Sequence, residues 1–182
     1  MKKEILLHAC CGPCSTYPIE KLQEDGYTPI VYFYNPCIHP HKEYILRLEE
    51  ARRYAEIKNV QFIEEIYNDK EWFKLTKDFQ EAPEGGARCN LCFDMRLKLC
   101  AQYAKEHKIP YITTTLSVSP HKNHPNICAI GNKAAEEYEV TFLEYNFKKE
   151  DGYRKSILIS KEHGLYRQNY CGCTYSMRTK DQ

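Results

Sequence analysis

Short apolar runs of strand length alternate with longer segments of helical periodicity along the chain, and this alternation limits the fold more than any other feature. The predicted strands are Glu4–His8, Pro29–Tyr34, Val60–Ile63, Tyr111–Thr114 and Val140–Leu143. The predicted helices are Ser15–Asp25, His41–Lys58, Lys70–Phe79, Leu91–Lys108, Ile127–Tyr138 and Gly152–His163. Such alternation is typical of βαβ units. The sequence therefore predicts an α/β fold with a mainly parallel five-stranded sheet and helices on both faces.

Length and charge narrow the class of protein further. The chain has 182 residues without an evident linker or repeat, so we expect a single α/β domain over residues 1–182. No run approaches the roughly 20 apolar residues of a membrane helix, and Ile5–Leu7 is too short for a secretory signal. We therefore expect a cytoplasmic protein without a membrane partner. The net charge of +1 indicates no general attraction to nucleic acid, which leaves a local basic patch as the way to bind it.

Seven of the ten cysteines fall into three tight groups near the start, the middle and the end of the chain. The groups are Cys10, Cys11 and Cys14; Cys89 and Cys92; and Cys171 and Cys173. Disulfides are rare in the cytosol, where grouped cysteines more often bind metal or take part in catalysis. Thiolates prefer zinc, copper(I) or iron–sulfur clusters. We expect the three groups to form one metal or redox site, completed by the tail 164–182. The isolated Cys37, Cys100 and Cys128 are interpreted as ordinary buried thiols.

Polar or cysteine-rich segments follow three of the predicted strands. HACCGPCS follows the first strand, NPCIHPHKEY the second and TLSVSPHKN the fourth. Ligands of open parallel sheets bind beyond the carboxyl ends of the strands, so we expect these segments to meet in one crevice. The first segment also opens a predicted helix, and a helix N-terminus lowers the pKa of a thiol and favours the thiolate.

Other side chains in these segments can contribute to the chemistry. Asp94 lies two residues after Cys92 and can give a metal an oxygen ligand, although it can equally be a solvated aspartate near a helix start. His39, in the loop after the second strand, can hold a proton near neutral pH. Arg96 can stabilise thiolate charge or bind phosphate. Arginines and tyrosines around Cys171 are of a kind that stacks on nucleic-acid bases.

Five motifs, in order along the chain, resemble those of one known family. HACCGPCS, NPCIHPHKEY, EGGARCNLCFDMRL, TLSVSPHKN and GLYRQNYCGC together resemble the QueH family of epoxyqueuosine reductases, and they span His8 to Cys173. Cys37 departs from the pattern, because the family usually carries asparagine there, and it is not counted as a ligand. The resemblance implies a HUP-like fold. It also implies a cobalamin-independent, two-electron reduction of the epoxide of epoxyqueuosine in the tRNA anticodon loop.

The resemblance further implies a 4Fe-4S cluster, a nearby mononuclear iron and an electron donor that it does not identify. The implied metal ligands are Cys10, Cys11, Cys89, Cys92, Asp94, Cys171 and Cys173, with Cys14 as a further candidate. Which cysteine binds which metal stays open. Asp94, as a metal ligand, and His39, as a proton donor, are the candidate catalytic residues. The candidate tRNA contacts are Arg96, Lys122, Arg154, Arg167 and Tyr170.

Three other functions are compatible with parts of the sequence. An iron–sulfur tRNA sulfurtransferase shares the fold class, but it uses an SGGxDS-type phosphate loop where this chain has HACCGPCS with one glycine. A zinc-stabilised RNA-binding module would contain zinc in place of iron and sulfide. A thiol–disulfide oxidoreductase needs only one CxxC pair and would leave two cysteine groups unexplained.

Overall fold

The computed structural model describes residues 3–177 and contains a five-stranded, all-parallel sheet with the strand order β3-β2-β1-β4-β5. The strands are β1 Lys3–His8, β2 Tyr27–Phe33, β3 Gln61–Glu64, β4 Tyr111–Thr114 and β5 Thr141–Phe142. The helices are α1 Gly12–Glu24, α2 His41–Ile57, α3 Asp69–Thr76, α4 Ala87–Glu106, α5 His124–Glu137 and α6 Gly152–Glu162. The predicted α/β class with a parallel five-stranded sheet is confirmed.

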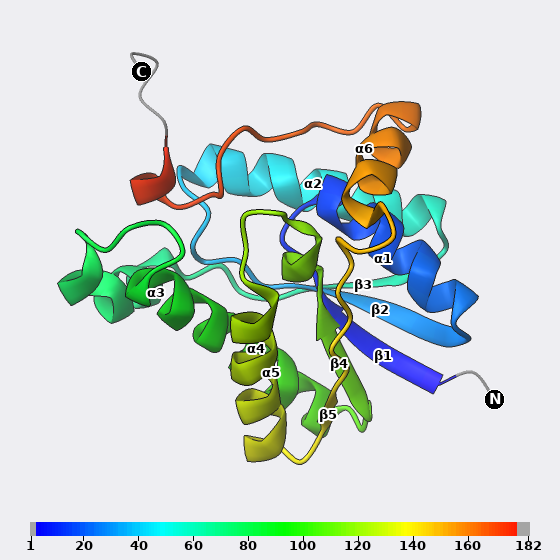
Figure 1. The fold of residues 1–182 in the computed structure, drawn as a ribbon, viewed down its shortest axis with the longest axis horizontal. Helices are drawn as coiled ribbons and strands as arrows, with labels where there is room; N and C mark the ends of the chain where they lie inside the picture. The colour runs from blue at the N-terminus through cyan, green and yellow to red at the C-terminus, as the bar shows by residue number, and fades with distance from the viewer. Residues whose placement is uncertain (1–2, 178–182) are drawn as a thin grey trace.

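Both faces of the sheet are covered, as Figure 1 shows. Ile5 and Leu7 of β1 pack into a buried cluster with α1 and α2, whereas Leu6 packs into a cluster with α4 and α5 on the opposite face. Successive side chains of a strand point to opposite faces, so a central strand buried on both faces reads as a continuous apolar run. Burial of each such side chain contributes about 1.5–3 kcal/mol. This explains why residues 5–7 of β1 are all apolar, without alternation.

The strand order reverses beside β1, which pairs with β2 on one side and β4 on the other. From β1 the chain passes to β2 and β3 in one direction, and then returns to place β4 and β5 in the other direction. Ligands of such sheets bind at this switch point, beyond the carboxyl ends of the strands. The segments after β1, β2 and β4 therefore share one end of the sheet.

Three helices begin three or four residues earlier than the sequence predicted, because their capping residues lie upstream of the apolar pattern. α1 begins after the N-cap residue Cys11, α4 after Gly86, and α5 after Asn123. The Asn123 side chain accepts a hydrogen bond from the Asn126 backbone N–H at 3.0 Å. The earlier start of α4 places Cys89 and Cys92 in its first two turns.

The segment after α6 crosses α2 in extended form and ends beside α3 (Figure 1). The buried Arg47 of α2 holds it, donating to the backbone oxygen atoms of Tyr170 at 3.2 Å and Cys171 at 2.8 Å. The His39 backbone N–H also donates to Gly172 O at 2.8 Å. Of the predicted tail 164–182, residues 178–182 lie outside the described part of the chain. The described part of the tail is thus bound to the loop after β2.

Within residues 3–177, none of the helices combines the length and the apolar character needed to cross a membrane.

Candidate metal and substrate site

The first group of thiols is built by the turn between β1 and α1. Cys11 is the N-cap residue of α1, and its thiol accepts a hydrogen bond from the Cys14 backbone N–H at 3.3 Å. The turn runs so close to α2 that a Cβ atom at Gly12 would lie 2.9 Å from the backbone of Glu50. Glycine is therefore required for this approach. The sulfur atoms of Cys10, Cys11 and Cys14 all lie within 4.8 Å of one another.

The spacing of these three sulfur atoms fits a single metal ion. The Sγ atoms of Cys10 and Cys11 are 3.9 Å apart. Thiolates around one tetrahedral ion with metal–sulfur bonds of about 2.3 Å lie about 3.8 Å from each other. Among residues 3–177 this is the only group of three or more His, Cys, Asp or Glu ligand atoms so closely spaced.

Neighbouring groups support negative charge on these sulfur atoms. The Gln168 amide donates to Cys11 Sγ at 3.0 Å, and the Thr115 hydroxyl donates to Cys10 Sγ at 3.5 Å. Hydrogen bonds from the Cys11 and Cys14 thiols hold the pKa of Cys10 well below its usual value, whereas burial raises the pKa of Cys11 to about 12. Without metal the group therefore shares its protons around the Cys10 sulfur, and a bound metal would displace them.

A second group of thiols lines a smaller cavity of about 30 Å³, which we call the inner cavity. Its cysteines come from the turn after β1, the loop after β2, the start of α4 and the tail. They are Cys10, Cys37, Cys89, Cys92, Cys171 and Cys173. The structure thus brings members of all three cysteine groups to one cavity, together with a thiol that the sequence reasoning had set aside.

One face of α4 forms a wall of the inner cavity. Residues three or four apart on a helix share a face, and Arg88, Cys89, Cys92 and Arg96 have this spacing and line the cavity. Arg96 is 3% exposed, and its guanidinium donates to Cys92 O at 3.1 Å and to Asn35 Oδ1 at 3.3 Å. No salt bridge joins Arg96 to a carboxylate within residues 3–177. A buried charge needs a partner, and the cavity thiolates supply the opposite charge.

The electrostatics of the inner cavity favour anionic sulfur. The Cys37 thiol and the Arg96 guanidinium lower the pKa of Cys92 to about 6, although burial opposes the shift. Burial also acts to lower the pKa of Arg96, but the negative charge on the sulfur atoms of Cys37 and Cys92, which share a proton, raises it, so Arg96 stays charged.

Arg88 Nε on the cavity wall is a buried N–H group without a hydrogen-bond partner in the described chain, and the Trp72 side chain lies near enough to Cys92 to lower the pKa of its thiol. Sulfur atoms of iron–sulfur clusters accept hydrogen bonds, and cysteine thiolates bind the irons. The residues of the inner cavity therefore fit such a cluster, both in their thiols and in the N–H donors beside them.

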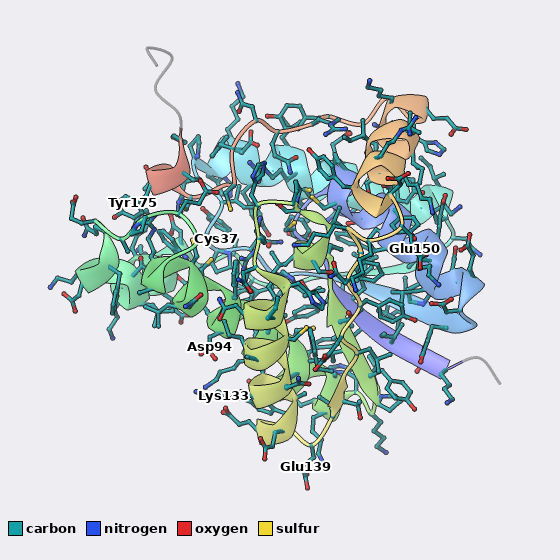
Figure 2. The ribbon with its side chains drawn as sticks, viewed as in Figure 1. Cys37, Asp94, Lys133, Glu139, Glu150 and Tyr175 are labelled. Carbon is teal, nitrogen blue, oxygen red and sulfur yellow. The ribbon has the colours of Figure 1, made fainter. Side chains whose placement is uncertain are left out.

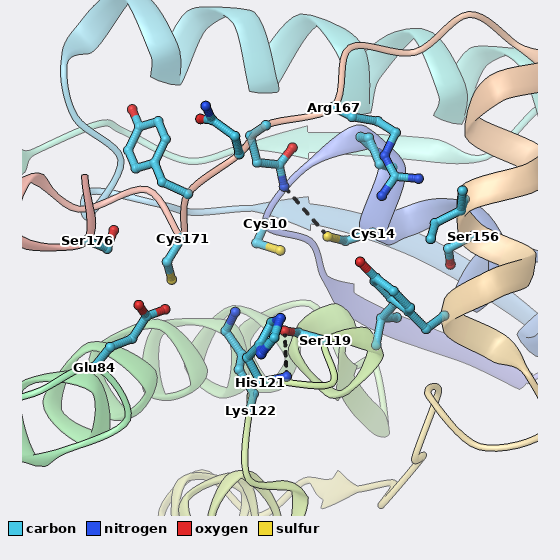
Figure 3. Close-up of a pocket in the computed structure, with 17 residues that line it drawn as sticks. Cys10, Cys14, Glu84, Ser119, His121, Lys122, Ser156, Arg167, Cys171 and Ser176 are labelled. Carbon is cyan, nitrogen blue, oxygen red and sulfur yellow. Dashed lines mark hydrogen bonds between the residues drawn. The ribbon is translucent and has the colours of Figure 1, made fainter. Parts of the chain in front are cut away.

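A larger cavity of about 320 Å³, which we call the outer cavity, opens beside these two sets of cysteines (Figure 3). Cys10, Cys14 and Cys171 face it from one side and Lys122 from another, and Arg167 lies at its edge. A volume above about 300 Å³ is typical of pockets for small ligands. Cys10 and Cys171 line both cavities, so a ligand in the outer cavity would contact two of the thiols that border the inner one.

Lys122 brings positive charge to the outer cavity. Burial acts to lower its pKa, but the electrostatic effect of the sulfur atoms of Cys171, Cys10 and Cys14 raises it above the ordinary value for lysine. The ammonium group therefore keeps its proton at neutral pH beside the thiols.

Comparison with known proteins identifies the family. The family model described as "Epoxyqueuosine reductase QueH" matches residues 5–179. A protein of that name from Histophilus somni is 44% identical over 176 residues, which cover 96% of this chain and 72% of the relative. A second relative of that name, from Thermotoga maritima, is 36% identical, and the match covers 95% of this chain and 90% of the relative. The chain belongs to the QueH family of epoxyqueuosine reductases.

Solved structures with a similar fold are more distant from this QueH family member. A predicted subunit of tRNA methyltransferase from Methanocaldococcus jannaschii has a TM-score of 0.62 at 12% identity, covering 99% of this chain and 94% of that one. The U34-tRNA thiolase NcsA from Methanococcus maripaludis, with its [4Fe-4S] cluster, has a TM-score of 0.59 at 13% identity. The match covers 97% of this chain and 62% of that one. These likenesses support the HUP-like fold.

The two candidate catalytic residues lie outside both cavities. The Asp94 carboxylate faces Lys98 Nζ at 3.8 Å, and Figure 2 shows it away from Cys37. Two residues along a helix turn the side chain by about 200°, so Asp94 points away from the face that carries Cys92. Its role as a metal ligand gains no support from this placement.

His39 is part of the packing that holds the tail. Its ring stacks on Phe73 with the centroids 4.6 Å apart, and Nδ1 accepts a hydrogen bond from the Thr174 backbone N–H at 3.3 Å. Burial lowers the pKa of His39, so the ring is mainly neutral at pH 7. Its role as a proton donor stays a prediction that this placement does not favour.

The candidate tRNA contacts fall into three settings. Lys122, Arg167 and Tyr170 line the outer cavity. Arg154 is exposed on α6 but lines neither of the two cavities in the described chain. Arg96 is buried against the thiols and is not available to RNA from outside. Of the two roles predicted for Arg96, its placement favours the stabilisation of thiolate charge.

Sequence reasoning did not single out several residues of the site. Cys37 and Trp72 line the inner cavity, Gln168 binds Cys11, and Arg47 holds the tail. Cys37 had a usable signal, because it follows β2 at the same end of the sheet where Cys10 follows β1. Arg47, Trp72 and Gln168 had no local signal, since their partners are distant in sequence.

Proposed function

We propose that this chain reduces the epoxide of epoxyqueuosine in the tRNA anticodon loop to give queuosine, without cobalamin. Membership of the QueH family supports the reaction. The observation that carries the proposal for this chain is that Cys10 and Cys171 line both the thiol-rich inner cavity and the outer cavity. A substrate in the outer cavity would therefore lie next to redox-active metal. We also expect the enzyme to work in the cytoplasm, together with its tRNA substrate.

The reaction needs two electrons and two protons. Two C–O bonds break, a carbon–carbon double bond forms, and the epoxide oxygen leaves as water. An external donor of unidentified nature supplies the electrons. A bound iron–sulfur cluster transfers electrons singly, and a metal ion with an open position polarises an oxygen atom.

We infer that the mononuclear iron and the 4Fe-4S cluster bind to different sets of cysteines. The close spacing of Cys10, Cys11 and Cys14 suits a mononuclear iron. The inner cavity would hold the 4Fe-4S cluster, because its cysteines come from four segments of the chain and offer enough thiolates for the irons. Cys89, Cys92 and Cys173 are the proposed thiolates of the cluster, and Cys171 of the tail lines both cavities.

The residues of the outer cavity bind and orient the nucleoside. Lys122 keeps its proton beside Cys10 and Cys171, so its ammonium group can stabilise negative charge on the departing oxygen. Gln168 carries a buried Oε1 without a partner in the described chain, and this atom can accept a hydrogen bond from a substrate hydroxyl or amine. Arg167 and Tyr170 lie where anticodon phosphates and unstacked bases can be bound.

Anaerobic assay with metal analysis tests the function. Protein purified without oxygen is expected to contain iron and acid-labile sulfide, and to convert epoxyqueuosine in tRNA to queuosine when a chemical reductant is supplied. Nucleosides released from the tRNA are identified by mass spectrometry. Full turnover by metal-free protein, or a requirement for added cobalamin, would contradict the proposal. Zinc without sulfide would favour an RNA-binding module, and ATP-dependent sulfur transfer would favour a sulfurtransferase.

A further inference from the structure

Cys37 lies on the wall of the inner cavity, although in sequence it is isolated from the other cysteines. Its side chain is 6% exposed and lines this cavity together with Cys89, Cys92, Cys171 and Cys173. It also belongs to the same buried cluster as Cys92 and Cys173. An ordinary core thiol, such as Cys100 against the sheet, has apolar neighbours instead.

The loop that carries Cys37 is bound directly to the tail that carries the last two cysteines. The His39 backbone N–H donates to Gly172 O at 2.8 Å, and the Tyr170 hydroxyl donates to His39 O. A Cβ atom at Gly172 would lie 3.2 Å from Ile38 Cγ1, so glycine allows the two segments to approach closely. Cys37 and the tail thiols are thus held at the cavity by one set of backbone contacts.

The charge of the cavity wall also suits an anionic ligand at this position. The buried Arg96 guanidinium faces the thiols without a carboxylate partner in the described chain, and Asn35, two residues before Cys37, accepts one of its hydrogen bonds. Soft sulfur donors of this kind select iron–sulfur clusters over hard ions.

We propose that Cys37 is a thiolate ligand of the metal group in the inner cavity, in addition to the cysteines of the three sequence groups. This inference depends on the metal content in the proposed function. A 4Fe-4S cluster takes four cysteine thiolates. Cys37, Cys89, Cys92 and Cys173 supply four, and Cys171, which is exposed, is then free to face the outer cavity.

Cysteine variants of the full chain, purified anaerobically with their metal, test the inference. Cys37→Ala and Cys37→Asp are compared with Cys100→Ala, which removes a fully buried thiol outside the cavity. The measurements are iron and sulfide content, the EPR spectrum of the reduced protein and the rate at which a chelator bleaches the visible absorption. We expect Cys37→Ala to bleach about tenfold faster or more, a scale typical of changes around a metal site. Cys37→Asp should retain iron but change the EPR spectrum, because oxygen replaces sulfur on one iron. Cys100→Ala should match the wild type.

Spectra, metal content and bleaching rates equal to those of the wild type in both Cys37 variants would overturn the inference while leaving the proposed function intact. Wild-type protein that lacks iron would instead overturn the proposed function itself. If the variants do not fold, alkylation of the wild-type protein decides. Cys37 should react only after a chelator removes the metal, at the same rate as Cys89, and reaction of Cys37 in the loaded protein would reject its role.

Discussion

The two sets of cysteines, one at the turn after β1 and one around the inner cavity, differ in how the chain assembles them. The group of Cys10, Cys11 and Cys14 is made by one turn, whose geometry follows from the end of β1 and the capping of α1. The inner cavity joins four segments of the chain, and its tail thiols depend on contacts made by Arg47 and His39. A local site needs little beyond its own turn, whereas an assembled site also depends on the docking of distant segments. We therefore expect the two sites to respond differently to mutation.

The largest effect should come from removing a central thiol of the inner cavity. Cys92→Ser is expected to lose acid-labile sulfide and all turnover, because Cys92 is buried in the cavity wall beside Arg96. Cys14→Ser should also lose turnover but keep its sulfide, since Cys14 does not line the inner cavity. Sulfide and iron assays distinguish the two. Cys128→Ser on α5 is the matched control, and normal sulfide in Cys92→Ser would contradict the assignment.

Loosening the tail should disturb the inner cavity more than the turn that holds Cys10, Cys11 and Cys14. Arg47→Leu removes the side chain that binds the backbone of Tyr170 and Cys171, and hydrogen bonds to a charged group contribute about 1.5–3 kcal/mol. Trypsin cleavage at the exposed Arg167 should then be roughly 10- to 100-fold faster, because cleavage follows the population of the open form.

Arg53→Leu is the control for the tail, since the half-exposed Arg53 also binds the segment after α6, at His163 O and Gly164 O. It should change the cleavage rate much less. Equal rates for the two variants would show that docking does not depend on Arg47.

Removing the buried positive charge of Arg96 should change the reduction potential of the metal group proposed for the inner cavity. Arg96→Gln is expected to lower the potential by on the order of 60 mV, or about 1.4 kcal/mol, because a nearby cation favours the state with the extra electron. Arg96→Lys, which keeps the charge, should recover most of the difference. Redox titration followed by EPR measures the potential, and equal potentials for the Gln and Lys variants would refute the electrostatic role.

The smallest effect is expected at the edge of the outer cavity. Arg167→Ala should weaken tRNA binding and reduce the slope of log affinity against log salt by about 1, as for the loss of one phosphate contact. Iron content should not change. Arg154→Ala, at an exposed position outside the two cavities, provides the comparison. An unchanged slope in Arg167→Ala would remove Arg167 from the RNA contacts, whereas an equal loss in Arg154→Ala would show that Arg154 contacts the RNA as well.

The sequence predicted the features that depend on local pattern. Apolar runs such as EILLH identified the strands, because a strand buried on both faces must be apolar throughout. The order of strands and helices then led to the parallel sheet, and the sheet rule led to the shared crevice. Helix starts were placed up to four residues late, as for Leu91 against Ala87 in α4, because caps such as Gly86 and Cys11 were not recognised.

Features that depend on tertiary contacts were not accessible in this way. Cys37 is isolated in sequence and occupies a position where the QueH family usually has asparagine, so the sequence predicts an ordinary buried thiol, although the loop after β2 carries it to the inner cavity. Asp94 was selected because it is close to Cys92 in sequence, although helix geometry turns it to another face. The same geometry applied to Arg96, four residues from Cys92, would have predicted that it faces the thiols.

The tail that contributes Cys171 and Cys173 is also the part of the described chain that the ribosome releases last. The sheet, α2 and α4 can fold while this segment is still being made, so the inner cavity is open on the tail side during synthesis. The proposed metal group can therefore meet its complete set of thiols only after the tail has been synthesised. Docking of the tail onto α2 then brings the last two thiols to the wall of the inner cavity.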